Sequence, residues 1–547
     1  MASSEPAAAV LGRPEALDVD ARHHEAGPQE GSTPVRNPDH VERQSGAPEV
    51  DYVEELLGAL PDVGLNTRFI SDFLARMRVT SPDIIRAVPV QHIFRGFARP
   101  LRQHGDYYHL SQVTARIGAF WPHSWHGSMR RKIFTVFFFH KSTAATILST
   151  TTAIFCYVAF GLAILPDDGN HSWWCLSVGS VTYALVMLVW QPQQLVFLDR
   201  VCISQTDPEL QTEGLLSLGG ILKNSDQMLV LWDSSWARRL WCIFELSAFL
   251  HSRPRGGKTN IRIRPTMLGF TICAAWFAFL LGGFTFHAVF YRLSVHREGF
   301  YLLLSICMAC CGLGFWYIAH LGREYCRDVS TMCQQIGHFR IAMAQCYCCS
   351  SDHQIDGSDT PMICDRVIIL HCIRRWFGSV EAFEEYVQNE VYDLLLDQLS
   401  NHMISYWRLA EATPVQFWVS LDRAALHLRL FFQRDSPHDL VWSLLIVING
   451  LALWLGVIPM VFRIMFRLGW VFQGKCSWRP LDWLKSLLVL LPGSFIFGLF
   501  LVMEYLLVNF LPEPFNACAF SFISLPLAAL AWKCLSVPVP HRSVRSV

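Results

Sequence analysis

Long apolar segments, each close to the length of a membrane-crossing helix, constrain this chain more than any other feature of its sequence. A helix needs about 20 mostly apolar residues to cross the hydrocarbon core of a bilayer. Six segments of the 547-residue chain approach that length, and 515–532 is a seventh candidate; the six are 143–164, 173–190, 266–291, 299–319, 438–462 and 485–510. The sequence therefore predicts a multi-span α-helical membrane protein with the lipid bilayer as its partner.

The composition agrees with this prediction. Hydrophobic residues make up 52% of the chain and charged residues only 16%, whereas soluble proteins carry about a quarter charged residues. The 45 basic and 45 acidic residues balance, and no basic stripe is present to neutralise a phosphate backbone, which argues against nucleic acid as a partner. The 18 cysteines, several of them within apolar segments, are expected to be mostly buried, reduced thiols.

Changes in composition divide the chain into eight predicted segments. Residues 1–50 are rich in Pro, Ala, Gly, Glu and Asp and contain no Phe, Trp or Tyr, which is typical of a disordered tail. The others are a cytosolic helical segment (51–142), a transmembrane hairpin (143–190), an α/β unit (191–265), a second transmembrane hairpin (266–319), a mainly helical cytosolic domain with a cysteine-rich loop (320–437), a C-terminal transmembrane bundle (438–535) and a tail (536–547). Two short amphipathic helices between 51 and 99 are expected to serve packing.

Lysine and arginine near the spans predict the orientation, because cytosolic flanks are enriched in these residues. A basic cluster precedes the first span, the next loop is acidic, and Arg323 and Arg327 follow the fourth span. The N-terminus and the stretches 191–265 and 321–437 are therefore expected to lie in the cytosol. The sequence does not specify which membrane the protein occupies.

The same rule fails for the basic residues between 463 and 479, which a complete fifth span would place outside. One solution is that 438–462 is a re-entrant or interfacial hairpin, broken at Asn449, Gly450 and Pro459. Such a hairpin would return the basic loop and the C-terminus to the cytosol.

The stretch 191–265 has the pattern of a small α/β unit. QLVFLDRV is an apolar run that ends in Asp199 and Arg200, as a buried parallel strand does where it enters a loop, and QMLVLWD at 227–233 is a second such run. A short helix lies between them, so the order strand, helix, strand predicts a right-handed crossover and a parallel sheet. Residues 258–265 are a candidate for a further strand.

FLDRVCIS, a helix ending in Ser225, and MLVLWDSSWARRLWCIFELSAF together resemble the TIR (Toll/interleukin-1 receptor) domain. The pattern ends in a helix that begins S-x-W-C-x-x-E-L, and the matching residues are Trp241, Cys242, Glu245 and Leu246. It covers about 60 of the 547 residues.

GAFWPHSWHG at 118–127 resembles the opening strand of such a domain, which would make the first two spans a hairpin inserted into the fold. The arrangement also resembles multi-span proteins of protists that have no defined activity. It departs from ordinary TIR domains in that hairpin and in the span that starts at Thr266.

The resemblance implies one of two roles. In enzymatic TIR domains the corresponding Glu contacts the nicotinamide-side ribose, so NAD⁺ is the implied substrate, Glu245 the implied catalytic residue, and Asp199 with Arg200 a gating loop. A carboxylate can stabilise the oxocarbenium-like state of glycosidic cleavage. Alternatively, Glu245 lies on a polar helix stripe and pairs with Arg238 or Arg239, and the unit acts in signalling through protein interaction and self-association.

The second cytosolic stretch contains a cysteine-rich loop. Cys346, Cys348, Cys349, Cys364 and His353 are soft ligands of the kind that bind structural zinc. The C-x-C-C spacing is not the usual C-x-x-C knuckle, so the sequence favours buried or loop thiols over zinc or S-acylation, and no firm cofactor is predicted. Downstream, Ser379 is expected to cap a helix, and the segment from Pro414 is expected to lie on the membrane surface or in the core.

A third hypothesis, a channel or transporter, requires ionisable residues at membrane depth. Only His287 and Glu504 qualify within the predicted spans, and both lie towards span ends. The sequence therefore favours an interaction module in signalling, with a membrane-held NAD⁺ hydrolase and a channel or transporter as the two alternatives.

Overall fold

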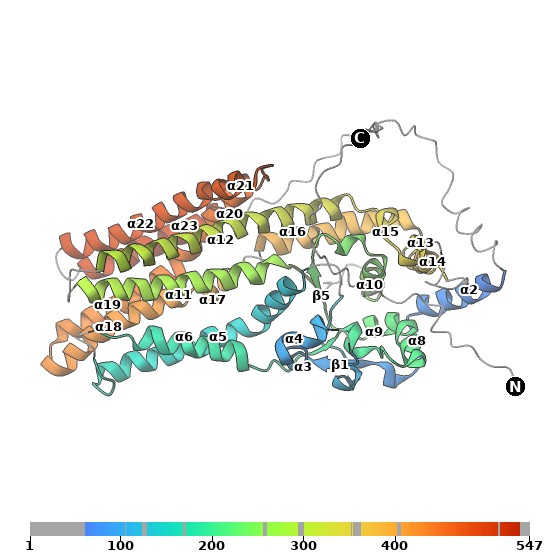
Figure 1. Cartoon of the computed structure of the whole chain (residues 1–547), viewed down its shortest axis with the longest axis horizontal. Helices are drawn as coiled ribbons and strands as arrows, with labels where there is room; N and C mark the ends of the chain where they lie inside the picture. Colours follow the sequence, from blue (N-terminus) through green and yellow to red (C-terminus); the bar gives the residue numbers. More distant parts are fainter. Residues whose placement is uncertain are drawn as a thin grey trace, which may run out of the picture.

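The computed structural model describes residues 61–535 except 104, 123–127, 168–170, 255–259, 294–299, 352, 354–362, 402–405 and 512–514. The predicted tail 1–50, the helix expected at 51–60, the HSW motif and the tail 536–547 lie outside these residues. The protein is mostly helical, with a long helical bundle at one end and a small mixed sheet covered by shorter helices at the other (Figure 1). We call the end of the bundle next to the sheet the sheet end and the opposite end the far end.

Apolar helices that run up and down between the sheet end and the far end build the bundle. Its elements are α5 (Met129–Gly161), α6 (Trp174–Val189), α11 (Met267–Leu293), α12 (Phe300–Gly337), α17 (Tyr406–Ala412), α18 (Val415–Arg434), α19 (Pro437–Ala452), the π-helical turn η7 (Leu453–Val457), α20 (Ile458–Val471), α21 (Arg479–Lys485), α22 (Leu487–Phe510) and α23 (Phe515–Cys534).

Four helical stretches among the described residues are long and apolar enough to cross a membrane: Met129–Gly161, Met267–Thr285, Pro437–Val471 and Arg479–Val508. Trp174–Val189 and Cys518–Cys534 are apolar but shorter. Every predicted span thus falls on a helix, with 299–319 lying in the 38-residue helix α12. This arrangement is compatible with a helical membrane protein.

The predicted re-entrant hairpin at 438–462 is wrong, because Pro437–Val471 is helical throughout. Pro459 lies in the first turn of α20, directly after the π-helical turn η7, and wider turns of this kind absorb irregularities within a helix. Gly450 serves close packing, since a Cβ at this position would come within 2.4 Å of the Ser420 Cβ of α18. Both residues fit the helix into the bundle and do not break it.

Helix α18 adds a pass between the two ends of the bundle that the sequence did not predict. Glu411, just before α18, contacts Ser142 of α5, whereas Arg429 near the end of α18 contacts the loop carbonyl of Leu165 after α5. Therefore α18 runs along the bundle, as the core-packing alternative predicted. It was not recognised as a span because its charged residues lower its hydropathy.

Because of this additional pass, the loop 472–478, which lies among the basic residues of 463–479, is at the sheet end. There Arg323 of α12 donates to the carbonyl of Phe472 at 2.8 Å and pairs with Asp482 at 2.9 Å. The loop and the sheet share one end of the bundle without any hairpin.

The sheet has six strands in the order β2-β1-β4-β3-β5-β6. They are β1 (Arg86–Pro89), β2 (Gln112–Val113), β3 (Ala119–Phe120), β4 (Leu195–Phe197), β5 (Met228–Trp232) and β6 (Ile261–Pro265). Strand β3 pairs in parallel with β4 and β5, and β5 with β6, whereas β1 pairs antiparallel with β4 and β2.

The sheet is therefore mixed and not purely parallel as predicted. The two antiparallel strands come from the segment before the first span, where we expected helices and a single strand at 118–127; that strand is present as β3. The expected strand at 258–265 is confirmed as β6.

The parallel strands follow the order of a doubly wound sheet, in which the first strand lies between the second and the third. The chain leaves β3, runs through the bundle as α5 and α6, and returns as β4. It then crosses to β5 through three short helices, α7 (Asp199–Cys202), α8 (Pro208–Leu216) and α9 (Leu218–Lys223), and continues through η4 (Trp236–Arg238) into α10 (Leu240–His251).

Short helices cover the sheet and join it to the bundle. Those before the first span are α2 (Pro61–Ala75), η2 (Pro82–Ile84), α3 (Val90–Ile93), α4 (Arg95–Arg102) and η3 (Tyr108–Leu110). Those after α12 are η5 (Ile341–Met343), α13 (Tyr347–Ser350), α14 (Asp365–Phe377), α15 (Val380–Tyr386), the π-helical turn η6 (Val387–Val391) and α16 (Tyr392–Asn401). The predicted cap is confirmed, since Ser379 Oγ accepts the Ala382 N–H at 3.0 Å.

Candidate functional sites

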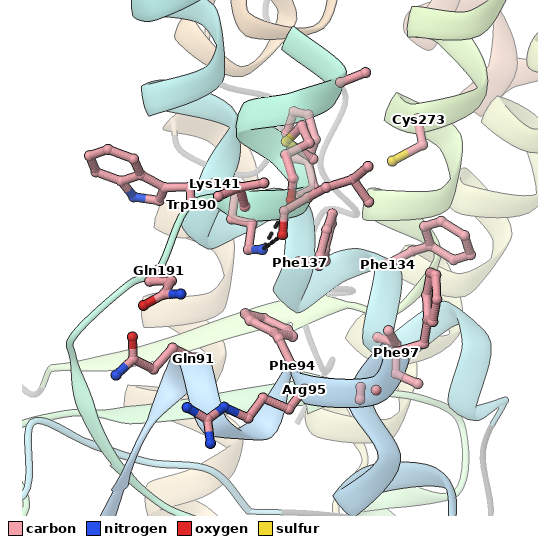
Figure 2. A pocket seen from close by; sticks show the side chains of 18 of the residues that line it. Gln91, Phe94, Arg95, Phe97, Phe134, Phe137, Lys141, Trp190, Gln191 and Cys273 are labelled. Atoms are coloured by element: carbon pink, nitrogen blue, oxygen red, sulfur yellow. Dashed lines mark hydrogen bonds between the residues drawn. The ribbon is translucent and has the colours of Figure 1, made fainter. Parts of the chain in front are cut away.

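A cavity of about 920 Å³ lies at the sheet end of the bundle, between α3, α4, α5, α6 and α11. Its walls are largely apolar, and Figure 2 shows Phe94, Phe134 and Phe137 among the side chains that line it. Leu188 and Phe277 also line the cavity and are 61% and 64% exposed, so the cavity opens onto the outer face of the bundle. Its volume is at the upper end of the range of small-molecule sites.

Lys141 of α5 is a buried cation inside this cavity. Its ammonium group donates to the carbonyls of Met187 and Leu188 at 3.0 and 3.2 Å (Figure 2). It also lies 4.3 Å from the ring centre of Phe137 and 5.3 Å from that of Phe94. Lys141 therefore caps the end of α6, where free carbonyls attract a cation.

Two arginines at the edge of the cavity are available to a ligand. Arg95 and Arg130 line the cavity and are exposed, and neither has an ion-pair partner among the described residues. Arg95 lies at the rim in Figure 2. An apolar interior with free cations at the rim matches the chemistry of an amphiphile with an anionic head group.

The rim also contains a left-handed turn at Gly96, Phe97 and Ala98, with φ angles of 58°, 55° and 58°. Left-handed conformations cost a residue with a Cβ about 1–2 kcal/mol. Arg102 holds the turn by donating to the carbonyls of Phe97 and Gly96 at 2.7 and 2.9 Å. As a result Phe97 is 81% exposed, a position that suits the interior of a bilayer better than water.

The walls of the cavity continue directly into the sheet. The N–H groups of Val90 and Gln91 in α3 donate to the carbonyls of Gln194 and Pro192 in the linker between α6 and β4, at 3.0 and 3.2 Å. Helix α3 follows β1, and β1 pairs with β4. The end of α6 is therefore joined to β4 through the linker and to β1 through the hydrogen bonds of α3.

The sequence analysis missed this site. The interleaved Arg and Phe residues of VQHIFRGFARPLR, just before the first span, are the signal that could have found it, because this pattern is typical of an interfacial segment. The segment was expected only to pack.

The predicted cysteine-rich site is brought together by the fold. Atoms of Cys348, Cys349, His353 and Cys364 that can bind a metal all lie within 4.8 Å of one another. Cys346 belongs to a second, overlapping group with Cys348 and Asp365. Thus all five predicted residues lie around one point beside the start of α14.

Glu245 lies inside α10 with only 9% of its surface exposed. The expected polar helix stripe is therefore wrong for this residue, because α10 is buried along most of its length. Burial raises the pKa of the Glu245 carboxyl well above its usual range, and the negative charge of Asp199 adds to this shift, whereas Arg239 opposes it. Glu245 does not line the 920 Å³ cavity.

The other residues of the TIR-like motif have structural contacts. Asp199 accepts the backbone N–H of Arg200 at 2.7 Å, and Arg200 donates to the carbonyl of Gln103 at 3.3 Å. The Trp241 indole donates to Asp365 at 3.0 Å. Cys242 is buried beside Glu245.

One buried charge within the bundle, Asp422, was missed by the sequence analysis, which identified only His287 and Glu504. Asp422 of α18 accepts from Ser172 Oγ at 2.6 Å and from the N–H groups of Cys175 and Leu176 at 2.9 and 2.8 Å, so it caps the start of α6. His287 lies 3.6 Å from the same carboxylate.

Glu504 pairs with Arg423 at 3.9 Å. These contacts fasten helices to one another. The channel or transporter hypothesis stays a prediction, with flux sensitive to Glu504 or His287 as its test.

The chain matches no protein-family model, no curated protein and no solved structure. The function is therefore argued from the geometry of its own residues.

Proposed function

We propose that this is an integral membrane protein whose bundle binds an anionic lipid in the 920 Å³ cavity and whose sheet unit is a TIR-like interaction module that responds to this lipid. The observation that carries the proposal is the cavity itself, which combines an apolar interior with the exposed arginines Arg95 and Arg130.

The outer face of the bundle supports the membrane location. Large apolar side chains stand exposed along its helices, among them Phe155 at 70%, Phe495 at 67% and Phe522 at 76%. Contiguous apolar surface on this scale is unfavourable in water and favourable in a lipid environment. On this proposal the sheet end is cytosolic, as the basic flanks predict.

The lipid is expected to enter sideways from the bilayer. Its acyl chains would lie among the aromatic side chains of α5 and α11, and its head group would meet Arg95 and Arg130 at the level of the membrane surface. Basic residues near a membrane surface attract anionic lipids by about 1 kcal/mol each. Removing both charges should therefore weaken binding by about 2 kcal/mol, or roughly 30-fold.

Signalling would follow from the continuity between the cavity and the sheet. A lipid that displaces the end of α6, where Lys141 caps the last carbonyls, would shift the linker to β4 and its hydrogen bonds to α3. A protein partner, or a second copy of the unit, would then bind to the surface of the sheet unit.

The test is lipid binding by the full-length protein in nanodiscs, with phosphatidic acid compared against phosphatidylcholine. Native mass spectrometry of the released protein reports the bound lipid. We expect preferential retention of phosphatidic acid, lost in the variant Arg95→Gln/Arg130→Gln and in Ala184→Trp, which fills the cavity. The matched control is Lys475→Gln/Arg479→Gln, which removes two exposed charges at the same end of the bundle but outside the cavity. Equal retention of both lipids by the parent protein, or equal losses in the cavity and control variants, would contradict the proposal.

NAD⁺ hydrolysis by Glu245 is the second candidate function. It is favoured by the position of α10, which follows β5 at the carboxyl edge of a doubly wound sheet, the edge at which such folds bind ligands. Because Glu245 is buried, the reaction would require the segment around Asp199 to open. The test is nicotinamide release from NAD⁺ at high protein density, compared between the parent protein and Glu245→Gln. Release that the substitution leaves unchanged, or no release by folded protein, counts against this candidate.

A further inference from the structure

We propose that Cys348, Cys349, His353 and Cys364 bind a structural zinc ion that fastens the helical domain to α10 of the sheet unit. This inference is independent of the lipid proposal. It extends the sequence analysis, which identified these residues but favoured unligated thiols.

Two separations between sulfur atoms of the set are those of a tetrahedral metal site. Cys364 Sγ lies 3.9 Å from Cys348 Sγ and 3.7 Å from Cys349 Sγ. Zn–S bonds of about 2.3 Å in a tetrahedron place two sulfur ligands about 3.8 Å apart. A disulfide requires about 2.05 Å between sulfurs, and all of these cysteines are free.

His353 supplies the fourth ligand atom. Its Nε2 is buried and has no hydrogen-bond partner among the described residues, an arrangement that costs about 1–3 kcal/mol unless the atom is otherwise satisfied. The residue has a left-handed backbone with φ of 58°, and its N–H donates to the carbonyl of Cys348 at 2.8 Å. This tight turn brings the ring towards the three sulfurs, and a bound metal would satisfy the nitrogen.

Two backbone features of the site suit metal-bound sulfur atoms. Cys364 is the N-cap residue of the 13-residue helix α14, where the partial positive charge of the helix terminus stabilises an anion. The backbone N–H of Asp365 donates to Cys348 Sγ at 3.3 Å, which is a typical outer contact of a metal-bound sulfur.

Three thiolates and one neutral imidazole are the Cys₃His set of structural zinc sites. Soft sulfur ligands disfavour Mg²⁺ and Ca²⁺. Cys346 Sγ lies 3.0 Å from Cys348 Sγ, so four cysteines are the competing ligand set, and the Cys346→Ser variant distinguishes the two sets. Binding would release the three thiol protons to solvent and leave a complex with one net negative charge.

The position of the site indicates what the metal would do. Gln345, just before the cluster, accepts the N–H of Leu240 at 3.3 Å and donates to the carbonyl of Arg238 at 2.6 Å. Asp365, just after Cys364, accepts from the Trp241 indole at 3.0 Å. Both sides of the cluster are therefore attached to the start of α10. The zinc would stabilise this contact between the cluster and α10, which lie more than 100 positions apart in the chain.

The experiment measures the zinc content of the full-length protein purified in detergent, by inductively coupled plasma mass spectrometry. We expect about one zinc per chain, and a loss of most of it in Cys364→Ser and in His353→Ala. Cys372→Ser is the matched control, because this buried cysteine lies in the same helix outside the cluster, and its zinc content should not change. The Co²⁺-substituted parent protein should show thiolate-to-cobalt charge-transfer absorption that falls in Cys364→Ser.

Two further variants test the assigned ligands. Asp365→Asn and Cys346→Ser should retain the metal, since both residues belong to the overlapping group and not to the Cys₃His set. Loss of zinc in these two variants with retention in His353→Ala would overturn the assignment. Absence of both zinc and a cobalt spectrum in monodisperse parent protein would overturn the site itself. His353→Ala changes a half-buried loop residue, so this variant should lose the metal while the protein stays folded.

Discussion

The lipid cavity and the cysteine cluster differ in how the chain builds them. The ligands of the cluster come from one stretch, Cys348 to Cys364, whereas the cavity takes its walls from four stretches between Gln91 and Phe277. A local set of reactive side chains can be recognised before the fold is known, because the residue types themselves carry the chemistry. A cavity is a property of the space between helices, and no single stretch contains it.

Breaking the ion pair between Lys132 and Asp233 should have the largest effect. Lys132 of α5 is 1% exposed and its ammonium lies 2.8 Å from Asp233 at the end of β5. Lys132→Met leaves a buried acid unpaired, which should lower the free energy of unfolding by about 3–5 kcal/mol. Chemical denaturation in detergent measures this loss.

The same variant tests whether the two sites are separate. It should impair lipid retention, because α5 forms a wall of the cavity, and leave zinc content unchanged. Partial recovery of stability in Lys132→Met/Asp233→Asn is the control, and full loss of zinc in Lys132→Met would show that the two regions are not independent.

Gly269→Ala should have the next largest effect. A Cβ at Gly269 would lie 2.3 Å from Thr135 Cα and 2.4 Å from Thr135 N, so α11 would have to move away from the backbone of α5. Overpacking of this kind costs about 1–3 kcal/mol, and contact with backbone atoms places it near the upper value. Gly282→Ala in the same helix meets no atom within 4 Å and should be neutral; equal thermal unfolding of the two variants would contradict this account.

Lys141→Met should have an intermediate effect confined to the cavity. It removes two hydrogen bonds to the last carbonyls of α6 and two cation–aromatic contacts, with an expected loss of about 2 kcal/mol. Hydrogen exchange should become faster in Trp174–Val189 and unchanged at the cysteine cluster. Uniformly faster exchange would indicate general unfolding instead.

Glu245→Gln should have the smallest effect, and in the stabilising direction. The folded-state pKa of Glu245 is raised by burial, so the protonated form stabilises the fold below the unfolded pKa of about 4.3, and this contribution is lost as pH rises towards the folded pKa. The amide variant should therefore be more stable at neutral pH by about 1 kcal/mol and should lose this advantage in acid. Parallel thermal unfolding curves of the two proteins at pH 4 and pH 7 provide the measurement, and an advantage that does not depend on pH would contradict the assigned cause.

The helices could be predicted because their signal is local. Apolar runs placed a helix at each predicted span, and Ser379 was recognised as a cap from its sequence alone. The strand at 261–265 was also predictable. In contrast, β1 and β2 were missed, since such short strands have little periodicity of their own and are formed by pairing: β2 with β1, and β1 with β4.

The sequence by itself determined an apolar, mostly helical chain, a small α/β unit and a cluster of soft ligands. Only the tertiary structure decided that α18 runs through the bundle despite Asp422, that Glu245 is buried, and that Arg95, Lys141 and Trp276 share one cavity. The physical reason is that burial of a charge depends on partners far away in the chain: Asp422 is stable inside the bundle because the start of α6, about 250 positions earlier, satisfies it.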